Sequence, residues 1–174
     1  MLLRGIASLS RWDGRTIVNR PDATVAGDVI SDLRTQSNTL SVWRADSDED
    51  INDAIVALSL NRTEVAKLSA LLLDEEDLKT MKITYSDKYP GKAPGAIDSI
   101  KAKHRDLLEI DYKRLGELSD YMMKIVHDNV KLVEISKPQL KVLLQQYRDC
   151  NKIKVEDMNE DLRLNLKWNE YGNS

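Results

Sequence analysis

The pattern of hydrophobic and polar positions predicts a sheet built from short strands. Three apolar runs have the length of a strand, at residues 39–45, 67–73 and 130–135. The first run, "TLSVWRA", is rich in β-branched and aromatic residues and places Leu40 and Val42 on one face, Ser41 and Trp43 on the other. The second run would also suit a helix segment, but its length favours a strand. Residues 1–38 have no sustained period, so short strands and turns are expected there.

A fourth alternating run lies at residues 162–168. Its letters, "LRLNLKW", alternate strictly between apolar and polar residues, which favours a half-buried antiparallel strand. Met158, Leu162 and Leu166 nevertheless follow the spacing of a helix. The pattern therefore leaves a strand and a helix open for this run.

Four stretches follow helical spacing. After Ser47, apolar residues form one buried stripe, and acids crowd the first turn, where the helix dipole favours them. "DEEDLKTM" predicts a short second helix, and Ser136 is expected to cap a third, with Pro138 in its first turn. Residues 97–127 predict one long helix of about eight turns. Its stripe, with steps of three and four, consists of Ile97, Ile100, Leu107, Leu115, Leu118, Met122 and Ile125.

These elements predict an α+β fold, in which a small mixed sheet packs with helices. The sheet would contain N-terminal strands, the runs at 39–45, 67–73 and 130–135 and, in the strand interpretation, 162–168. The strand, helix, strand, helix order between residues 39 and 81 suggests a parallel crossover. One domain, 1–174, is expected. The loop at 86–95, which has two Pro-Gly pairs, offers a boundary between an α/β part at 1–85 and a helix-rich part at 96–174.

The composition is that of a folded globular chain. Apolar residues make up 41% and charged residues 32%, and the net charge is only -3, which excludes intrinsic disorder. No apolar run approaches the roughly 20 residues that a membrane span needs. The single cysteine, Cys150, cannot form an intramolecular disulfide, which favours a reducing compartment. A cytoplasmic location and no membrane association are therefore expected.

Basic residues divide unevenly along the chain. All seven before position 67 are arginine, whereas fifteen lysines and four arginines follow. Arginine suits carboxylates and phosphates and stacks on aromatic rings, and its combination with tryptophan is typical of interfaces and nucleotide sites. A solvated surface without a binding role would explain the same pattern. The candidate binding residues are Arg11, Trp12, Arg15, Arg20, Arg34, Trp43 and Arg44.

His104 and Asp111 are the candidate catalytic residues. Both fall on the apolar stripe of the expected long helix, where polar groups must find partners. Seven residues separate them, about 10 Å along a helix axis, so they would act only through a third group. Alternatively, each is satisfied by a neighbouring group and has no catalytic role. The chain contains no phosphate-binding loop, no nucleophile elbow and no metalloprotease motif.

Asp46, Asp48 and Asp50 alternate like the opening of a calcium-binding loop. Such a loop needs glycine at its sixth position and glutamate at its twelfth, but Ile51 and Ala57 occupy these positions. The acids are therefore expected to serve the helix dipole, and no metal or other cofactor is expected.

Two classes of function fit these observations. The favoured one is a non-enzymatic interaction module that binds a protein partner or a second copy of itself, through an Arg/Trp surface or the long amphipathic helix. The alternative is a small enzyme or nucleotide-binding protein that acts on a phosphate-bearing ligand through the N-terminal arginines, with His104 as acid or base. Nucleic-acid binding is not expected, because aspartates nearly balance the arginines of the first third.

Overall fold

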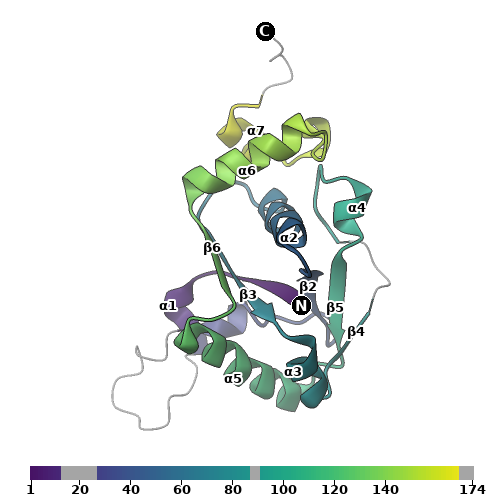
Figure 1. Cartoon of the computed structure of the whole chain (residues 1–174), viewed down its shortest axis with the longest axis vertical. Coiled ribbons are helices and arrows are strands. Elements are labelled where there is room, and N and C mark those ends of the chain that lie inside the picture. The colour runs from purple at the N-terminus through teal and green to yellow at the C-terminus, as the bar shows by residue number, and fades with distance from the viewer. Residues whose placement is uncertain (13–26, 87–90, 169–174) are drawn as a thin grey trace.

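An antiparallel sheet forms the centre of the protein (Figure 1). The computed structural model describes residues 1–12, 27–86 and 91–168. Within them the sheet has six strands in the order β4-β5-β2-β1-β3-β6, and every pairing is antiparallel. The strands are β1 (Leu2–Ile6), β2 (Leu40–Arg44), β3 (Leu68–Leu73), β4 (Thr84–Ser86), β5 (His104–Leu108) and β6 (Leu132–Ile135).

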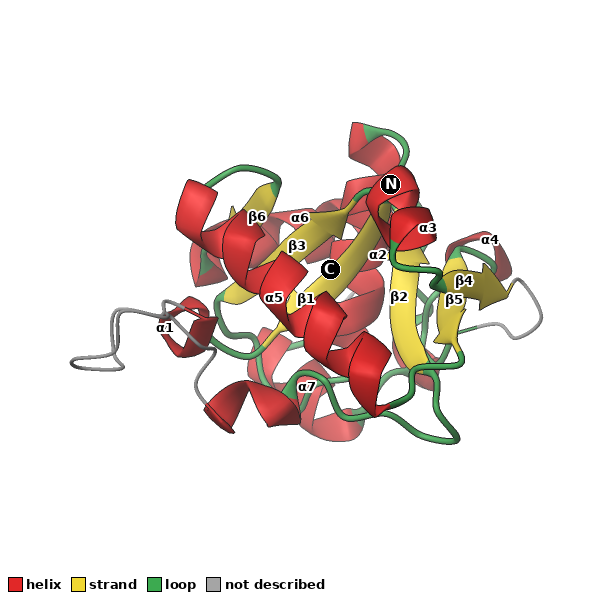
Figure 2. Ribbon diagram, turned by 90° about the horizontal axis from the view of Figure 1, so that it is seen from below, coloured by secondary structure: helices red, strands yellow, loops and turns green. Residues whose placement is uncertain are grey.

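Helices cover both faces of the sheet. One face carries α1 (Leu9–Trp12), the 3-10 turn η2 (Gly27–Ser31), α3 (Glu75–Thr80) and α5 (Tyr112–Asp128). The other face carries α2 (Asp48–Leu60), α4 (Asp98–Lys101), α6 (Lys137–Asp149) and α7 (Glu160–Leu166), with a second 3-10 turn, η3 (Val155–Asp157), before α7. Figure 2 shows α5 crossing the sheet on the first of these faces.

The sheet separates two hydrophobic cores, and β3 contributes to both. Its Leu71 and Leu73 pack with α1, α3 and α5, while its Leu68 and Ala70 pack with α2, α6 and α7. A strand that is buried on both faces does not alternate between apolar and polar residues, which explains why Ser69 is the only polar residue of β3.

The predicted α+β class is confirmed, and so are three of the predicted strands. The runs at 39–45, 67–73 and 130–135 form β2, β3 and β6. The sheet is antiparallel rather than mixed, because β1 lies between β2 and β3. These two strands point the same way, as the predicted crossover requires, but each pairs with β1 and not with the other.

The expected helix at 97–127 is wrong. The segment forms three elements, α4, β5 and α5, of which β5 pairs with β2 from His104 to Leu107. Glu109 has φ of 54°, a left-handed conformation that ends the strand path, and Asp111 then caps α5 by accepting a hydrogen bond from the Arg114 N–H at 2.8 Å. Pairing with a distant strand thus overrode a spacing that suited a helix.

The run at 162–168 is not a strand, and the helical spacing of Leu162 and Leu166 was the better guide. Asn159 caps α7 by accepting hydrogen bonds from the N–H groups of Asp161 and Leu162, at 2.9 and 3.4 Å. Leu164, which a strand would have buried, is 57% exposed.

Both predicted serine caps are confirmed. Ser47 accepts a hydrogen bond from the Asp50 N–H at 3.1 Å, and Ser136 forms a capping box with Gln139 at the start of α6. In the described ranges, every helix is too short or too polar to cross a membrane.

Candidate functional site

A cavity of about 810 Å³ lies on the α2 side of the sheet, beside β2. Three neighbouring strands, β1, β2 and β5, supply side chains to it, and the C-terminal part of α2 contributes Leu58 and Asn61. The connection from η2 to β2 and the loop before α4 complete the lining. Segments that are distant in the chain therefore meet at this cavity.

Strand register places a polar group on the cavity floor. In the antiparallel pair of β2 and β5, Trp43 lies opposite His104 and Ser41 lies opposite Asp106. Since residues two apart share a face, all four side chains point to the α2 side. Ser41 Oγ donates to Asp106 Oδ1 at 3.3 Å, and His104 Nε2 lies 3.8 Å from the same oxygen. The Trp43 and His104 rings meet edge to face, with centroids 5.2 Å apart.

Arg4 brings a partly buried positive charge to the cavity. Arg4 lies on the face of β1 that carries Leu2 and Ile6, opposite to α2, and its guanidinium reaches Ser41 where the paired register of β1 and β2 stops at Leu3 and Trp43. Its Nη1 donates to the Ser41 carbonyl oxygen at 2.6 Å and its Nη2 to the Asp32 carbonyl oxygen. Its Nε is buried and has no hydrogen-bond partner in the described structure. Burial lowers the pKa of the Arg4 guanidinium, and the Asp32 carboxylate opposes that shift.

Arg34 and Lys92 add two further positive charges to the lining. Neither side chain forms an ion pair with another residue that the structure describes. With Arg4, the lining carries three cationic side chains against one carboxylate, Asp106, a net +2 with His104 neutral. The whole chain has a net charge of -3, so the cavity opposes the overall charge of the protein.

Local contacts hold Lys92 at the cavity. Asn61, the C-cap of α2, donates from its side-chain amide to the Lys92 carbonyl oxygen and to the Ala57 carbonyl oxygen. The preceding residue is Gly91, where an added Cβ would lie 2.3 Å from Cη2 of Trp43. Only glycine therefore lets this loop pack so closely on the Trp43 ring.

Three of the residues predicted from the sequence, Arg34, Trp43 and His104, come together in this cavity. Asp111 does not join His104, because it caps α5 and lines a different cavity of about 440 Å³. Asp106, two residues after His104, lies beside the histidine instead.

The other predicted binding residues have structural surroundings or lie outside the described part. Trp12 is 1% exposed, and its Nε1 donates to Asp32 Oδ2 at 2.9 Å. Arg11 donates to Ser31 Oγ at 2.9 Å, and exposed Arg44 pairs with the Asp46 carboxylate. Arg15 and Arg20 lie outside the described residues.

The expected Arg/Trp surface needs a correction for its aromatic part. Trp12 and Trp43 are 1% and 3% exposed, so neither ring offers a stacking surface to solvent. Arg11, Arg34 and Arg44 are exposed, but they do not share one cavity with both rings. Of the arginines that the structure describes in the N-terminal third, Arg4 and Arg34 line the cavity.

The sequence analysis did not single out the other lining residues, among them Arg4, Ser41, Lys92 and Asp106. Arg4 had a visible signal, because an arginine inside the apolar strand "LLRGI" must find partners when the strand is buried. The others had none, since their proximity depends on strand pairing and on one loop.

The acids near the start of α2 pair with basic side chains and with a backbone N–H group. Asp46 pairs with Arg44, and Asp50 pairs with Lys103 at 2.5 Å and accepts a hydrogen bond from the Asp46 N–H at 3.1 Å. Across the ranges that the structure describes, no three or more His, Cys, Asp or Glu side chains are grouped to hold a metal ion.

Comparisons with protein-family models, with curated proteins and with solved structures found no match. The fold and the cavity therefore define the protein only as an α+β chain with a cationic cavity between a helix and three strands. Any function must be argued from that geometry.

Proposed function

We propose that this protein binds a small organic anion in the cavity between α2 and the strands β1, β2 and β5. The observation that carries the proposal is Arg4, a partly buried cation that has two backbone carbonyl partners, one buried and unpartnered Nε and no carboxylate partner within hydrogen-bond distance in the described structure. Burying a charge is costly unless an opposite charge or hydrogen bonds compensate it. A bound anion would supply that compensation.

The rest of the lining supports the same ligand class. Arg34 and Lys92 raise the local charge to +2 and have no carboxylate of their own among the described residues. Ligand cavities usually measure about 300–1,000 Å³ and combine apolar walls with a few polar groups. The volume of about 810 Å³ and the apolar side chain of Leu58 fit a molecule larger than a simple inorganic ion.

The proposal predicts that anions raise the melting temperature. Wild-type protein would be screened in 150 mM salt against phosphate, pyrophosphate, citrate and adenosine monophosphate. A ligand at 100 times its Kd adds about 2.7 kcal/mol. At about 2–4 °C per kcal/mol for a chain of this size, the expected shift is about 5–11 °C.

A charge-matched pair of variants tests where the anion binds. The double variant Arg34→Ala/Lys92→Ala should lose most of the shift. The control Arg44→Ala/Lys79→Ala removes one arginine and one lysine that do not line the cavity, and it should keep the shift. A silent panel, or equal responses of the two double variants, would refute the proposal.

The interaction-module hypothesis stays a prediction. Its surface would need tryptophan rings that are buried here, and its long helix is replaced by α4, β5 and α5. An acidic segment of a partner protein could use the same cations. In that case the wild-type protein would capture a stoichiometric protein partner, and the double variant Arg34→Ala/Lys92→Ala would not capture it. None of the small anions would then raise the melting temperature of the wild-type protein.

A further inference from the structure

Resting on the proposed anion site, we infer that the ligand is a phosphomonoester whose organic part carries a hydroxyl or amino hydrogen-bond donor. The phosphate would lie among Arg4, Arg34 and Lys92, and the donor would bind Asp106. The lining combines three cationic side chains with one carboxylate, and a ligand with an anionic end and a donor end would match both.

A cation from β1 and a carboxylate from β5 line the same cavity, on either side of Ser41 in β2. Arg4 Nη1 donates to the Ser41 carbonyl oxygen, and Ser41 Oγ donates to Asp106 Oδ1. A ligand that contacts both charged groups must present an anion to Arg4 and a hydrogen-bond donor to Asp106.

The cationic end suits a phosphate. A phosphomonoester carries a charge of about -1.5 to -2 at pH 7 on three acceptor oxygens. Two guanidinium groups and one ammonium group offer several donors, and arginine in particular matches phosphate oxygens in pairs. The net +2 of the lining is close to the charge that a phosphate monoester would bring.

Asp106 is the group that a simple anion would not explain. Its side chain is 19% exposed, and its Oδ1 accepts from Ser41 Oγ and faces His104 Nε2. Its Oδ2 has no hydrogen bond from the residues that the structure describes. A carboxylate in an anion site repels the ligand unless the ligand donates a hydrogen bond to it. Oδ2 is the free acceptor for such a donor.

The apolar part of the lining would hold the body of the ligand. Trp43 and Leu58 lie on the same cavity as the charged ends, one on β2 and the other on α2. Leu58, which is only partly buried, offers carbon surface to a sugar or nucleoside carbon framework, and such a framework gains affinity when it leaves water.

The test uses Asp106→Asn, which keeps the shape and removes the charge. By calorimetry at pH 8, methyl phosphate, which has no donor, should bind this variant several times more tightly than wild type, because a repulsion is lost. The tightest-binding ester among ribose 5-phosphate, glucose 6-phosphate and adenosine monophosphate should bind it about tenfold or more weakly, because a hydrogen bond to a charged group is lost. The opposite signs make the test specific.

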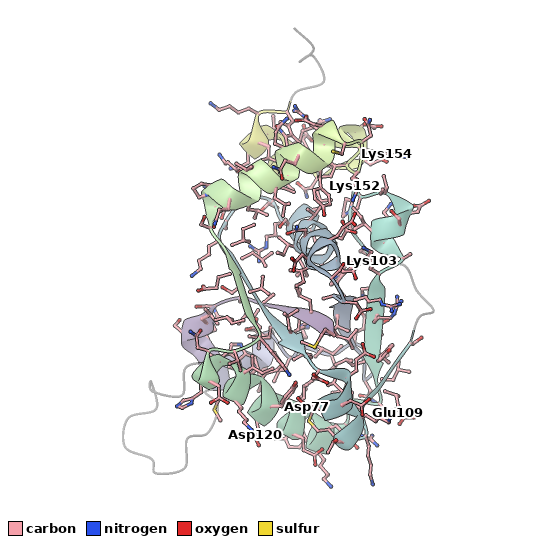
Figure 3. The ribbon with its side chains drawn as sticks, viewed as in Figure 1. Asp77, Lys103, Glu109, Asp120, Lys152 and Lys154 are labelled. Carbon is pink, nitrogen blue, oxygen red and sulfur yellow. The ribbon has the colours of Figure 1, made fainter. Side chains whose placement is uncertain are left out.

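Asp120→Asn is the control, since Asp120 is exposed on α5, on the far side of the sheet (Figure 3), and its affinities should equal those of wild type. A second measurement needs no variant: blocking the donor groups of the best ester with methyl groups should cost wild type a similar tenfold. If Asp106→Asn strengthens both ligands alike, or the blocked ester binds as tightly as the free one, the inference is overturned while anion binding stands. If the ester binds Arg34→Ala/Lys92→Ala as tightly as wild type, the proposed function itself fails.

Discussion

Asp53 joins the helices on the α2 side of the sheet, and its removal should destabilise the protein strongly. Asp53 lies in α2 and is 4% exposed. Its Oδ1 accepts a hydrogen bond from the Tyr147 hydroxyl at 2.7 Å, and its Oδ2 accepts from Lys103 Nζ at 2.5 Å. Lys152 Nζ lies 3.9 Å from Oδ1. Figure 3 shows Lys103 and Lys152 on this side of the sheet, so one carboxylate connects α2, α6 and two loops.

The cost of Asp53→Ala follows from what it leaves behind. The buried Tyr147 hydroxyl loses its acceptor, and Lys103 keeps only Asp50, which is 2.5 Å away. Breaking a fully buried pair costs about 3–5 kcal/mol. Lys103 is 23% exposed and retains one carboxylate, so the expected loss is at the low end, about 3 kcal/mol. At about 2–4 °C per kcal/mol, the melting temperature should fall by about 6–12 °C.

Urea unfolding followed by circular dichroism would measure this loss. Asp48→Ala is the matched control, because Asp48 is an exposed acid in the first turn of the same helix and should cost less than about 1 kcal/mol. Asp53→Asn retains an acceptor for Tyr147 and should lie between the two. If Asp53→Ala costs no more than Asp48→Ala, the reasoning that this network holds α2 to α6 is refuted.

Two further predictions concern Gly91 and Tyr147. Gly91→Ala should destabilise the protein by about 1–3 kcal/mol, because the added Cβ would lie 2.3 Å from the Trp43 ring. Gly116→Ala should stabilise it by about 0.5–1 kcal/mol, because Gly116 lies within α5 with open space around it. Urea unfolding measures both changes, and equal unfolding free energies for the two variants would contradict the prediction. Burial, and then the hydrogen bond to Asp53, raises the pKa of the Tyr147 phenol above 10.0. The unfolding free energy should therefore fall as pH rises above about 10, where only the unfolded phenol ionises, and Tyr147→Phe should make that fall shallower by up to about 1.4 kcal/mol per pH unit.

Local signals in the sequence were sufficient for several elements. Ser47 and Ser136 were recognisable as caps because a cap acts within three residues, and both helices begin there. The apolar run of β3 was recognisable because burial on both faces leaves Ser69 as the only polar residue of the strand. At 97–127, by contrast, the spacing of Ile100, Leu107 and Leu118 suited one helix although three elements share it.

The candidate site was only partly accessible to sequence reasoning. Arg34, Trp43 and His104 were singled out for their chemistry, but nothing near them in the chain could show that they share a cavity. His104 was matched with Asp111 on a helix that does not exist, whereas strand geometry places Asp106 beside it. Residues two apart lie on one face of a strand but not of a helix, so the wrong element gave the wrong partner.

The sequence by itself determined the α+β class and the capped starts of α2 and α6, and it favoured a strand over a helix at 67–73, because these depend on interactions within a few residues. Only the tertiary structure decided the sheet order, the division of 97–127 and the cavity. Those depend on which distant segments pair, and in particular on β2, which lies between β1 and β5. That pairing brings the partly buried charge of Arg4 to the same cavity as Asp106 and Lys92, about a hundred residues further along the chain.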